Sequence, residues 1–161
     1  LPFAASSFDA VTCRIAAHHF PNPQIFLCEV RRILKPGGVF AFEDNVAPDD
    51  ENLDTFLNEV ERLRDPTHVR SYTVSEWERW FEEADFEVRK SHVMKKKLDY
   101  ETWIDSLDTP EENRERVESM LREPPVENPE RARELYEISC SEDGGIESFS
   151  NLKLLVRAEV S

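Results

Sequence analysis

The sequence has few cysteines and no long hydrophobic segment. Its three cysteines, Cys13, Cys28 and Cys140, are odd in number and widely spaced, which argues against a zinc-binding spacing and a disulfide framework. We expect three reduced thiols in a cytoplasmic protein, and no metal site. The longest apolar runs are too short to span a bilayer and no signal peptide is recognisable, so we expect no membrane segment.

Positive charge is also scarce. The chain has 20 Lys and Arg residues against 34 Asp and Glu residues, which gives a formal net charge of −14. A field of that sign repels phosphate backbones and anionic lipids, which argues against partners of either kind. With 161 residues, 39% of them hydrophobic, the chain fits one domain with its own core.

What is present begins with a strand–helix–strand pattern. Residues 8–14 are rich in strand-forming types, and Asn22-Pro23 predicts the start of a helix. We expect the apolar residues of that helix, Cys28 among them, to lie in the core. Pro36-Gly37-Gly38 predicts a helix end with a left-handed glycine cap. Residues 39–44 then predict a buried strand, parallel to the first.

The remainder of the chain alternates helical and strand patterns. Residues 49–63 predict an amphipathic helix, and Ser75 with Glu78 predicts a capping box for the next one. Residues 86–98 and 149–160 predict strands. Between these two strands lies a charged, proline-punctuated region with three predicted helices, at residues 100–107, 111–122 and 129–138.

Several short motifs occur in a fixed order along the chain. They are Leu1-Pro2-Phe3, the SFDAV segment at 7–11, His18-His19-Phe20 and the LKPGG segment at 34–38, followed by RDPTHVRSY at 64–72. Together they resemble the middle and end of class I S-adenosylmethionine-dependent methyltransferases. The specific resemblance is to the ubiquinone/menaquinone-biosynthesis-like group, and it covers nearly the whole chain.

The resemblance implies a Rossmann-like α/β fold with a sheet of strand order 3-2-1-4-5-7-6. The four predicted strands would be strands four to seven, with the last one antiparallel between the fifth and the sixth. Residues 1–161 would then form the C-terminal part of a methyltransferase domain, including a helical insertion at about 99–141 before the last strand.

The family's glycine-rich first turn and its acidic strand end, which hold the cofactor, have no counterpart in this sequence. The chain also begins at Leu1 rather than Met, so we expect the truncated half of a longer enzyme. A sheet of order 4-5-7-6 leaves strand four as an edge, and leaves one face of Val, Phe and Leu uncovered. We expect either the insertion or a second copy in a homodimer to cover that face.

The resemblance also implies contacts to S-adenosylmethionine. The loop before strand four would lie along the adenine, and the carboxyl end of that strand would face the methionyl group. Core packing of the loop, and a surface ion pair for Arg14, are the alternatives. The residues assigned to the cofactor are Leu1, Pro2, Phe3, Cys13, Arg14 and Ile15.

His18 and His19 follow that strand end and are the candidates for acid–base catalysis. A base matters only if the methyl acceptor must lose a proton. In the alternative, one histidine packs on the following helix and the other faces water. The residues that we assign to the methyl acceptor are Asp44, His68, Arg70 and Tyr72. The last three could form a lid over the acceptor together with Tyr100 and Trp103, although aromatic packing explains these residues equally well.

Two functions stay open at this level. One is methyl transfer from S-adenosylmethionine to a small-molecule acceptor as part of an intact enzyme. The alternative is a non-catalytic fragment that acts as a dimerising or assembly module. The resemblance alone supports the activity, because composition and periodicity predict only an α/β domain.

Overall fold

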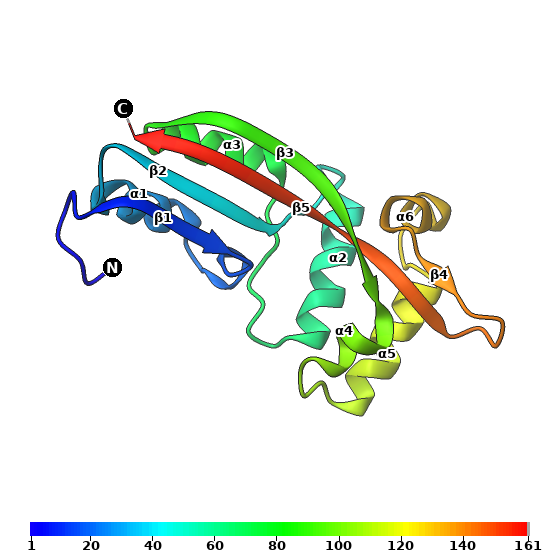
Figure 1. Cartoon of the computed structure of the whole chain (residues 1–161). Helices are drawn as coiled ribbons and strands as arrows, with labels where there is room; N and C mark the ends of the chain where they lie inside the picture. The colour runs from blue at the N-terminus through cyan, green and yellow to red at the C-terminus, as the bar shows by residue number, and fades with distance from the viewer. Residues whose placement is uncertain (161) are drawn as a thin grey trace.

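The structure, a computed structural model, describes residues 1–160 of the chain. Its strands are β1 (Phe8–Arg14), β2 (Leu34–Asn45), β3 (Phe86–Asp99), β4 (Ser139–Cys140) and β5 (Ile146–Val160). They form one mixed sheet in the order β1-β2-β5-β3, with the short β4 beside β5 (Figure 1). β1 and β2 are parallel, and β5 is antiparallel to both β2 and β3. The predicted order 4-5-7-6 is therefore confirmed, and β1 is an edge strand.

Helices connect the strands and also form a group of their own. They are the short 3₁₀ helix η1 (Ala17–His19), α1 (Pro23–Ile33), α2 (Glu51–Arg64), α3 (Val74–Glu83), α4 (Tyr100–Asp105), α5 (Glu111–Arg122) and α6 (Pro129–Tyr136). No helix among residues 1–160 is long and apolar enough to cross a membrane.

Helix α1 begins as its sequence predicts but buries a different face. The Asn22 side chain accepts a hydrogen bond from the Ile25 N–H at 3.0 Å, and proline follows it at the first helical position. The buried residues include Leu27, Val30 and Ile33, at a spacing of three. Cys28 lies about 100° around the helix axis from Leu27 and is exposed, so its predicted place in the core was wrong.

The glycine pair belongs to a strand rather than to a helix cap. The helix ends on Leu34, which has extended backbone, and β2 begins there because Leu34 pairs with Phe8 of β1. Gly37 adopts φ +75° within this first part of β2. At Gly38 a Cβ atom would lie 2.8 Å from the Lys35 carbonyl oxygen, closer than real Cβ contacts allow. The expected left-handed cap was therefore wrong.

Helices α1 and α3 cover one face of the sheet. Phe40 of β2 contacts Phe26 of α1 and Phe81 of α3 at ring-centroid distances of 6.0 Å and 5.9 Å. The capping box of α3 is Thr73 with Glu76, which bond reciprocally through their side chains and backbone N–H groups. The predicted capping box, Ser75 with Glu78, lies two positions later and was wrong.

The opposite face of the sheet is more polar than predicted. Side chains alternate along a strand, so Phe40 and Phe42 point to the covered face while Ala41 and Glu43 point to the other. Glu43 forms an ion pair of 2.9 Å with Arg14 on that second face. We expected the uncovered face to carry Val, Phe and Leu. This was wrong for phenylalanine, because Phe40 and Phe42 lie on the covered face.

The helices that precede β5 form a second core with α2. This core lies where β5 continues past the end of β2, and Phe149 of β5 packs edge-on against Trp103 of α4 at 4.8 Å. The Tyr136 hydroxyl of α6 donates to the Leu53 carbonyl of α2 at 3.0 Å. Among residues 1–160 these helices extend the structure along β3 and β5 (Figure 1). Of the two covers expected for the open face, the insertion was therefore wrong, and a second copy of the chain stays a prediction.

Candidate functional site

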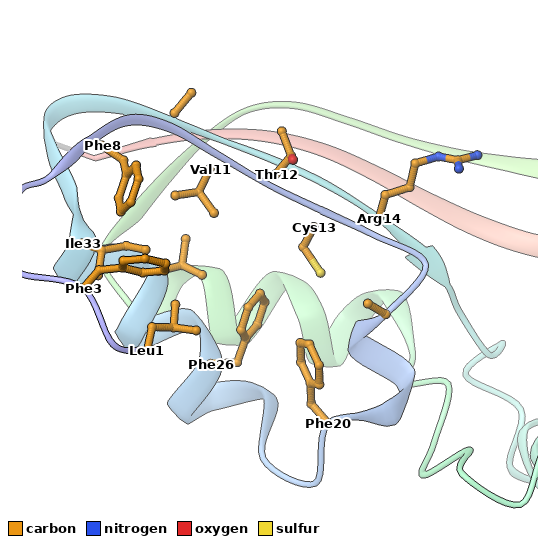
Figure 2. Close-up of a pocket in the computed structure, with 13 residues that line it drawn as sticks. Leu1, Phe3, Phe8, Val11, Thr12, Cys13, Arg14, Phe20, Phe26 and Ile33 are labelled. Atoms are coloured by element: carbon orange, nitrogen blue, oxygen red, sulfur yellow. The ribbon is translucent and has the colours of Figure 1, made fainter.

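An apolar groove of about 490 Å³ runs between the exposed edge of β1 and helix α1 (Figure 2). Four of the residues predicted to hold the cofactor line it: Leu1, Phe3, Cys13 and Arg14. Pro2 and Ile15 are not among its lining residues. Arg32 of α1 holds the first segment in place, because its guanidinium donates to the carbonyls of Phe3 and Leu1 at 2.9 and 3.1 Å.

Two polar residues of the groove, Arg14 and Cys13, have limited reactivity. Arg14 is already paired with Glu43 across the strands. Burial, together with the nearby carboxylate of Asp44, raises the pKa of the Cys13 thiol to about 11. Cys13 is therefore a neutral thiol at physiological pH, and the groove offers mainly apolar contact.

The chain turns sharply at the carboxyl end of β1, next to the groove. Ile15 adopts the left-handed conformation with φ +49°, and its N–H donates to the Glu43 carbonyl at 2.8 Å. Such backbone costs about 1–2 kcal/mol for a β-branched residue. The turn directs the next two N–H groups toward the end of β2, at the sheet edge where open α/β sheets bind ligands.

Asp44 receives those N–H groups. Its buried carboxylate accepts hydrogen bonds from the backbone of Ala16 at 3.1 Å, Ala17 at 2.5 Å and Asn45 at 2.7 Å. Its fourth partner is Nδ1 of His18, at 2.5 Å. Since a carboxylate can only accept here, Nδ1 of His18 donates the hydrogen bond, and in the neutral form of the ring the lone pair is on Nε2. Nε2 has no hydrogen-bond partner among residues 1–160.

The RDPTHVRSY segment fastens η1 to the rest of the site. The His18 carbonyl accepts from the N–H groups of Val69 and Arg70 at 2.9 and 3.0 Å. The His19 ring bonds through Nδ1 to the Thr67 carbonyl at 2.9 Å. The His18 ring centroid lies 4.1 Å from that of His19 and 5.5 Å from that of His68. Three histidines thus meet at the carboxyl ends of β1 and β2.

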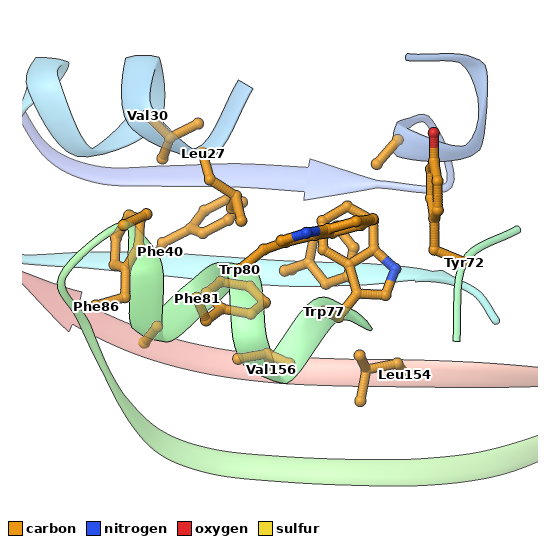
Figure 3. Close-up of a cluster of buried hydrophobic side chains, with 14 of the residues drawn as sticks. Leu27, Val30, Phe40, Tyr72, Trp77, Trp80, Phe81, Phe86, Leu154 and Val156 are labelled. Carbon is orange, nitrogen blue, oxygen red and sulfur yellow. The ribbon is translucent and has the colours of Figure 1, made fainter. Parts of the chain in front are cut away.

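The other residues predicted for the acceptor have structural contacts. Arg70 joins Asp54 at 2.7 Å and Glu76 at 3.1 Å. Tyr72 is buried beside Trp77 and packs edge-on against Trp80 at 4.9 Å (Figure 3). Tyr100 and Trp103 belong to the second core. The structure therefore brings His68 to His18, and places Tyr100 and Trp103 in a different cluster.

Sequence reasoning missed a set of buried polar residues behind the histidines. Glu61 accepts from the Asn151 amide at 2.8 Å, and burial raises the pKa of this carboxyl group. Lys153 donates to Asn45 Oδ1 at 2.7 Å, and burial lowers its pKa. Asn58, the fourth buried residue of this set, bonds to His68. The available signal was a polar residue within an apolar pattern, as at Lys153 in the LKLLV stretch.

Among residues 1–160 no group of three or more His, Cys, Asp or Glu side chains is arranged to hold a metal ion. The site itself presents three histidines, the Asp44 carboxylate and the apolar groove along β1. A base held by a carboxylate beside an apolar groove suits a reaction in which a proton leaves a bound organic molecule.

Comparison with known proteins gives a consistent result. The model of a family described as "Methyltransferase domain" matches residues 2–91. The "Uncharacterized methyltransferase YcgJ" of Bacillus subtilis is 35% identical over 157 residues, which are 98% of this chain and 60% of that protein. The "Uncharacterized protein YafE" of Escherichia coli is 40% identical over 111 residues, 69% of this chain and 54% of that protein. The chain thus spans little more than half the length of these two relatives.

Two crystal structures share the fold in detail. BH2331 from Bacillus halodurans superposes with a TM-score of 0.90 at 36% identity, covering 99% of this chain and 72% of that one. The YcgJ protein superposes with a TM-score of 0.92 at 34% identity, covering 99% and 67%. The likeness extends over β3, β5 and the helices between them, well beyond residues 2–91.

Proposed function

This chain belongs to the family of methyltransferase domains, and from that premise we propose that the protein transfers a methyl group from S-adenosylmethionine to a small molecule whose accepting atom carries a proton. The observation that carries the proposal is the bond between His18 Nδ1 and Asp44 at the carboxyl ends of β1 and β2. Such a pair can take up a proton, which favours an acceptor that is a hydroxyl, thiol or amine compound.

His18 acts as the general base in this proposal. Asp44 fixes the ring orientation and the Nδ1–H tautomer, so that Nε2 takes the proton from the acceptor. The positive charge that then forms on the ring is stabilised by the Asp44 carboxylate. His19 is the competing assignment, but its Nδ1 is engaged with the Thr67 carbonyl, and its Nε2 already faces the Asp65 carboxylate at 3.8 Å.

The groove along β1 fits part of the cofactor. Leu1 and Phe3 offer apolar surface for the adenine ring, while Cys13 and Arg14 lie toward the end of β1 where the methionyl group is expected. Pro2 and Ile15 would contribute through their backbone only. The sulfonium of S-adenosylmethionine would supply the electrophilic methyl group. The groove residues offer little to bind the ribose hydroxyls, so those partners would come from elsewhere in the assembled protein.

A second candidate role is assembly. β1 pairs with β2 along one side only, and a free strand edge favours pairing with another chain. We include a homodimer through this edge in the proposal. Sedimentation equilibrium tests the dimer, and a monomer at all concentrations would remove this role.

The cysteines bear on the location of the protein. All three are free thiols, which supports a reducing, cytoplasmic environment.

Cofactor binding is tested by titrating the protein with S-adenosylhomocysteine in a calorimeter. We expect micromolar binding, with Phe3→Ala weakening it and the exposed Val93→Ala on β3 leaving it unchanged. No binding at millimolar ligand would overturn the cofactor site in this chain.

The base is tested with a panel of a phenol, a thiol and an amine. Asparagine can imitate the Nδ1 donor of histidine, so His18→Asn keeps the bond to Asp44 but removes Nε2. We expect it to lower the rate by about 10²–10⁴-fold. His19→Asn is the matched variant, because it keeps the bond to Thr67 in the same way. A larger loss in His19→Asn would assign the base to His19.

A further inference from the structure

Asn58 lies on α2 about 140° around the helix axis from Leu53, away from the apolar face of the helix, and is nevertheless buried. It is 5% exposed, and its neighbours Leu57 and Val60 belong to the second core. A buried amide is costly unless all its donors and acceptors are bonded. Each of them is bonded here, which indicates that the residue holds specific groups in place.

The backbone determines which way the Asn58 amide points. Its nitrogen lies 3.1 Å from the Asp54 carbonyl, 2.7 Å from Asp54 Oδ1 and 3.1 Å from the Ser71 carbonyl. Its oxygen accepts from the Ser71 N–H at 2.7 Å. Exchanging the two atoms would place an oxygen against three oxygens and a nitrogen against an N–H. The orientation is therefore fixed, and Arg70 secures Asp54 through an ion pair of 2.7 Å.

This orientation decides the protonation of His68. Its Nε2 lies 2.9 Å from the Asn58 oxygen, which can only accept, so Nε2 carries the proton. Burial, followed by the charges of His18, Arg62 and His19, lowers the pKa of His68 to about 4, against a smaller opposing effect of Asp65. The ring is therefore neutral at physiological pH, and its Nδ1 lone pair has no partner among residues 1–160.

We propose that Asn58 is a positioning residue that holds His68 in the Nε2–H tautomer, so that His68 Nδ1 accepts a hydrogen bond from a hydroxyl or amine of the methyl acceptor. The acceptor part of this proposal rests on the proposed function, whereas the tautomer does not. The ring centroid of His68 lies 5.5 Å from that of His18, which places the acceptor's donor group beside the atom that loses its proton.

Two-bond ¹H–¹⁵N spectra of the histidine side chains test the tautomer. We expect the wild-type protein at pH 7 to show a protonated Nε2 and an unprotonated Nδ1 for His68. Asn58→Asp should raise the pKa of His68 by about 1–3 units, because a carboxylate then faces Nε2. Asn52→Asp adds the same charge at an exposed position of α2 and should leave the pKa unchanged. A wild-type Nδ1–H tautomer, or equal shifts in both variants, would overturn the assignment.

Kinetics test the contact with the acceptor. At a pH where Asn58→Asp has protonated His68, Nδ1 donates instead of accepting. KM for a hydroxyl or amine acceptor should then rise about tenfold with little change in kcat, while Asn52→Asp keeps the wild-type KM. An unchanged KM in Asn58→Asp would overturn the contact. If the wild-type protein turns over no acceptor, the proposed function fails, and the spectra still decide the tautomer.

Discussion

Nδ1 of His18 lies 2.5 Å from Oδ1 of Asp44, although 26 positions separate the two residues in the chain. The parallel pairing of β1 with β2 brings them together, since Arg14 and Glu43 are register partners at the carboxyl ends of those strands. The left-handed turn at Ile15 then completes the arrangement by leading the chain back over β2. The pair is therefore a product of tertiary structure, built at the edge where ligands bind in this class of sheet.

Asp44→Asn should destabilise the fold. An amide cannot accept through its nitrogen, so at least one buried donor among Ala16, Ala17 and His18 loses its partner. We expect the free energy of unfolding to fall by about 1–3 kcal/mol, measured by urea unfolding at pH 7. Asp9→Asn is the control, because Asp9 is exposed and contacts only Lys35 through its side chain. Equal midpoints for the two variants would contradict the role of Asp44.

Stability should depend on pH through His68. Its pKa is about 4 in the folded chain and about 6.5 in the unfolded chain, so between these values the unfolded state binds more protons. The contribution of neutral His68 is complete above pH 6.5 and is lost as the pH falls toward 4.

Unfolding curves at several pH values check this. The stability difference between the wild-type protein and His68→Gln should shrink as the pH is lowered from 6.5 to 4. His92→Gln, at an exposed position on β3, should give a curve parallel to that of the wild type. Parallel curves for both variants would show that His68 is not held neutral.

The sequence predicts local structure where the signal is local. The residues of β1 identify a strand with the correct bounds, and Asn22 with Pro23 identifies the start of α1. The early start of β2 depends on the pairing of Leu34 with Phe8, which no local pattern contains. The face that α1 buries was ambiguous for a similar reason: apolar residues surround much of the helix, and the sheet selects Leu27.

The candidate site likewise has parts that the sequence predicts and parts that only the assembled fold shows. The motif carried by the resemblance pointed to His18, and the strand end pointed to Asp44, but neither indicated that the two residues bond. Asn58 lies outside the apolar face of α2 and gives no signal in the sequence, whereas Lys153 interrupts the apolar pattern of β5. Their partners, His68 and Asn45, come from other elements, so their role becomes visible only when those elements are assembled.

Two residue pairs at the start of α3, Thr73 with Glu76 and Ser75 with Glu78, have the spacing of a capping box, and a mutation at each distinguishes them. Thr73→Ala should lower the free energy of unfolding by about 1–2 kcal/mol, because its hydroxyl caps the Glu76 N–H. Thr73→Ser should retain most of that stability. Ser75→Ala should have a smaller effect, since its hydroxyl contacts only Asp49 and Thr73. Thermal unfolding that ranks Ser75→Ala as the more harmful change would contradict the assignment.

The three thiols should react at two distinct rates. Cys28 and Cys140 are exposed, whereas Cys13 is half-buried with a pKa of about 11. At pH 8 the thiolate fraction of Cys13 is lower than that of an ordinary cysteine by roughly two orders of magnitude. Ellman's reagent should therefore modify two thiols rapidly and the third slowly.

Single substitutions assign the rates to residues. Cys28→Ser should remove one rapid thiol, and Cys13→Ser should remove only the slow one. Urea should make all three rapid, because unfolding exposes Cys13 and restores an ordinary pKa. A single rapid thiol that persists unchanged in Cys28→Ser would place Cys28 inside the core, and α1 would then have to bury a wider face than the one centred on Leu27.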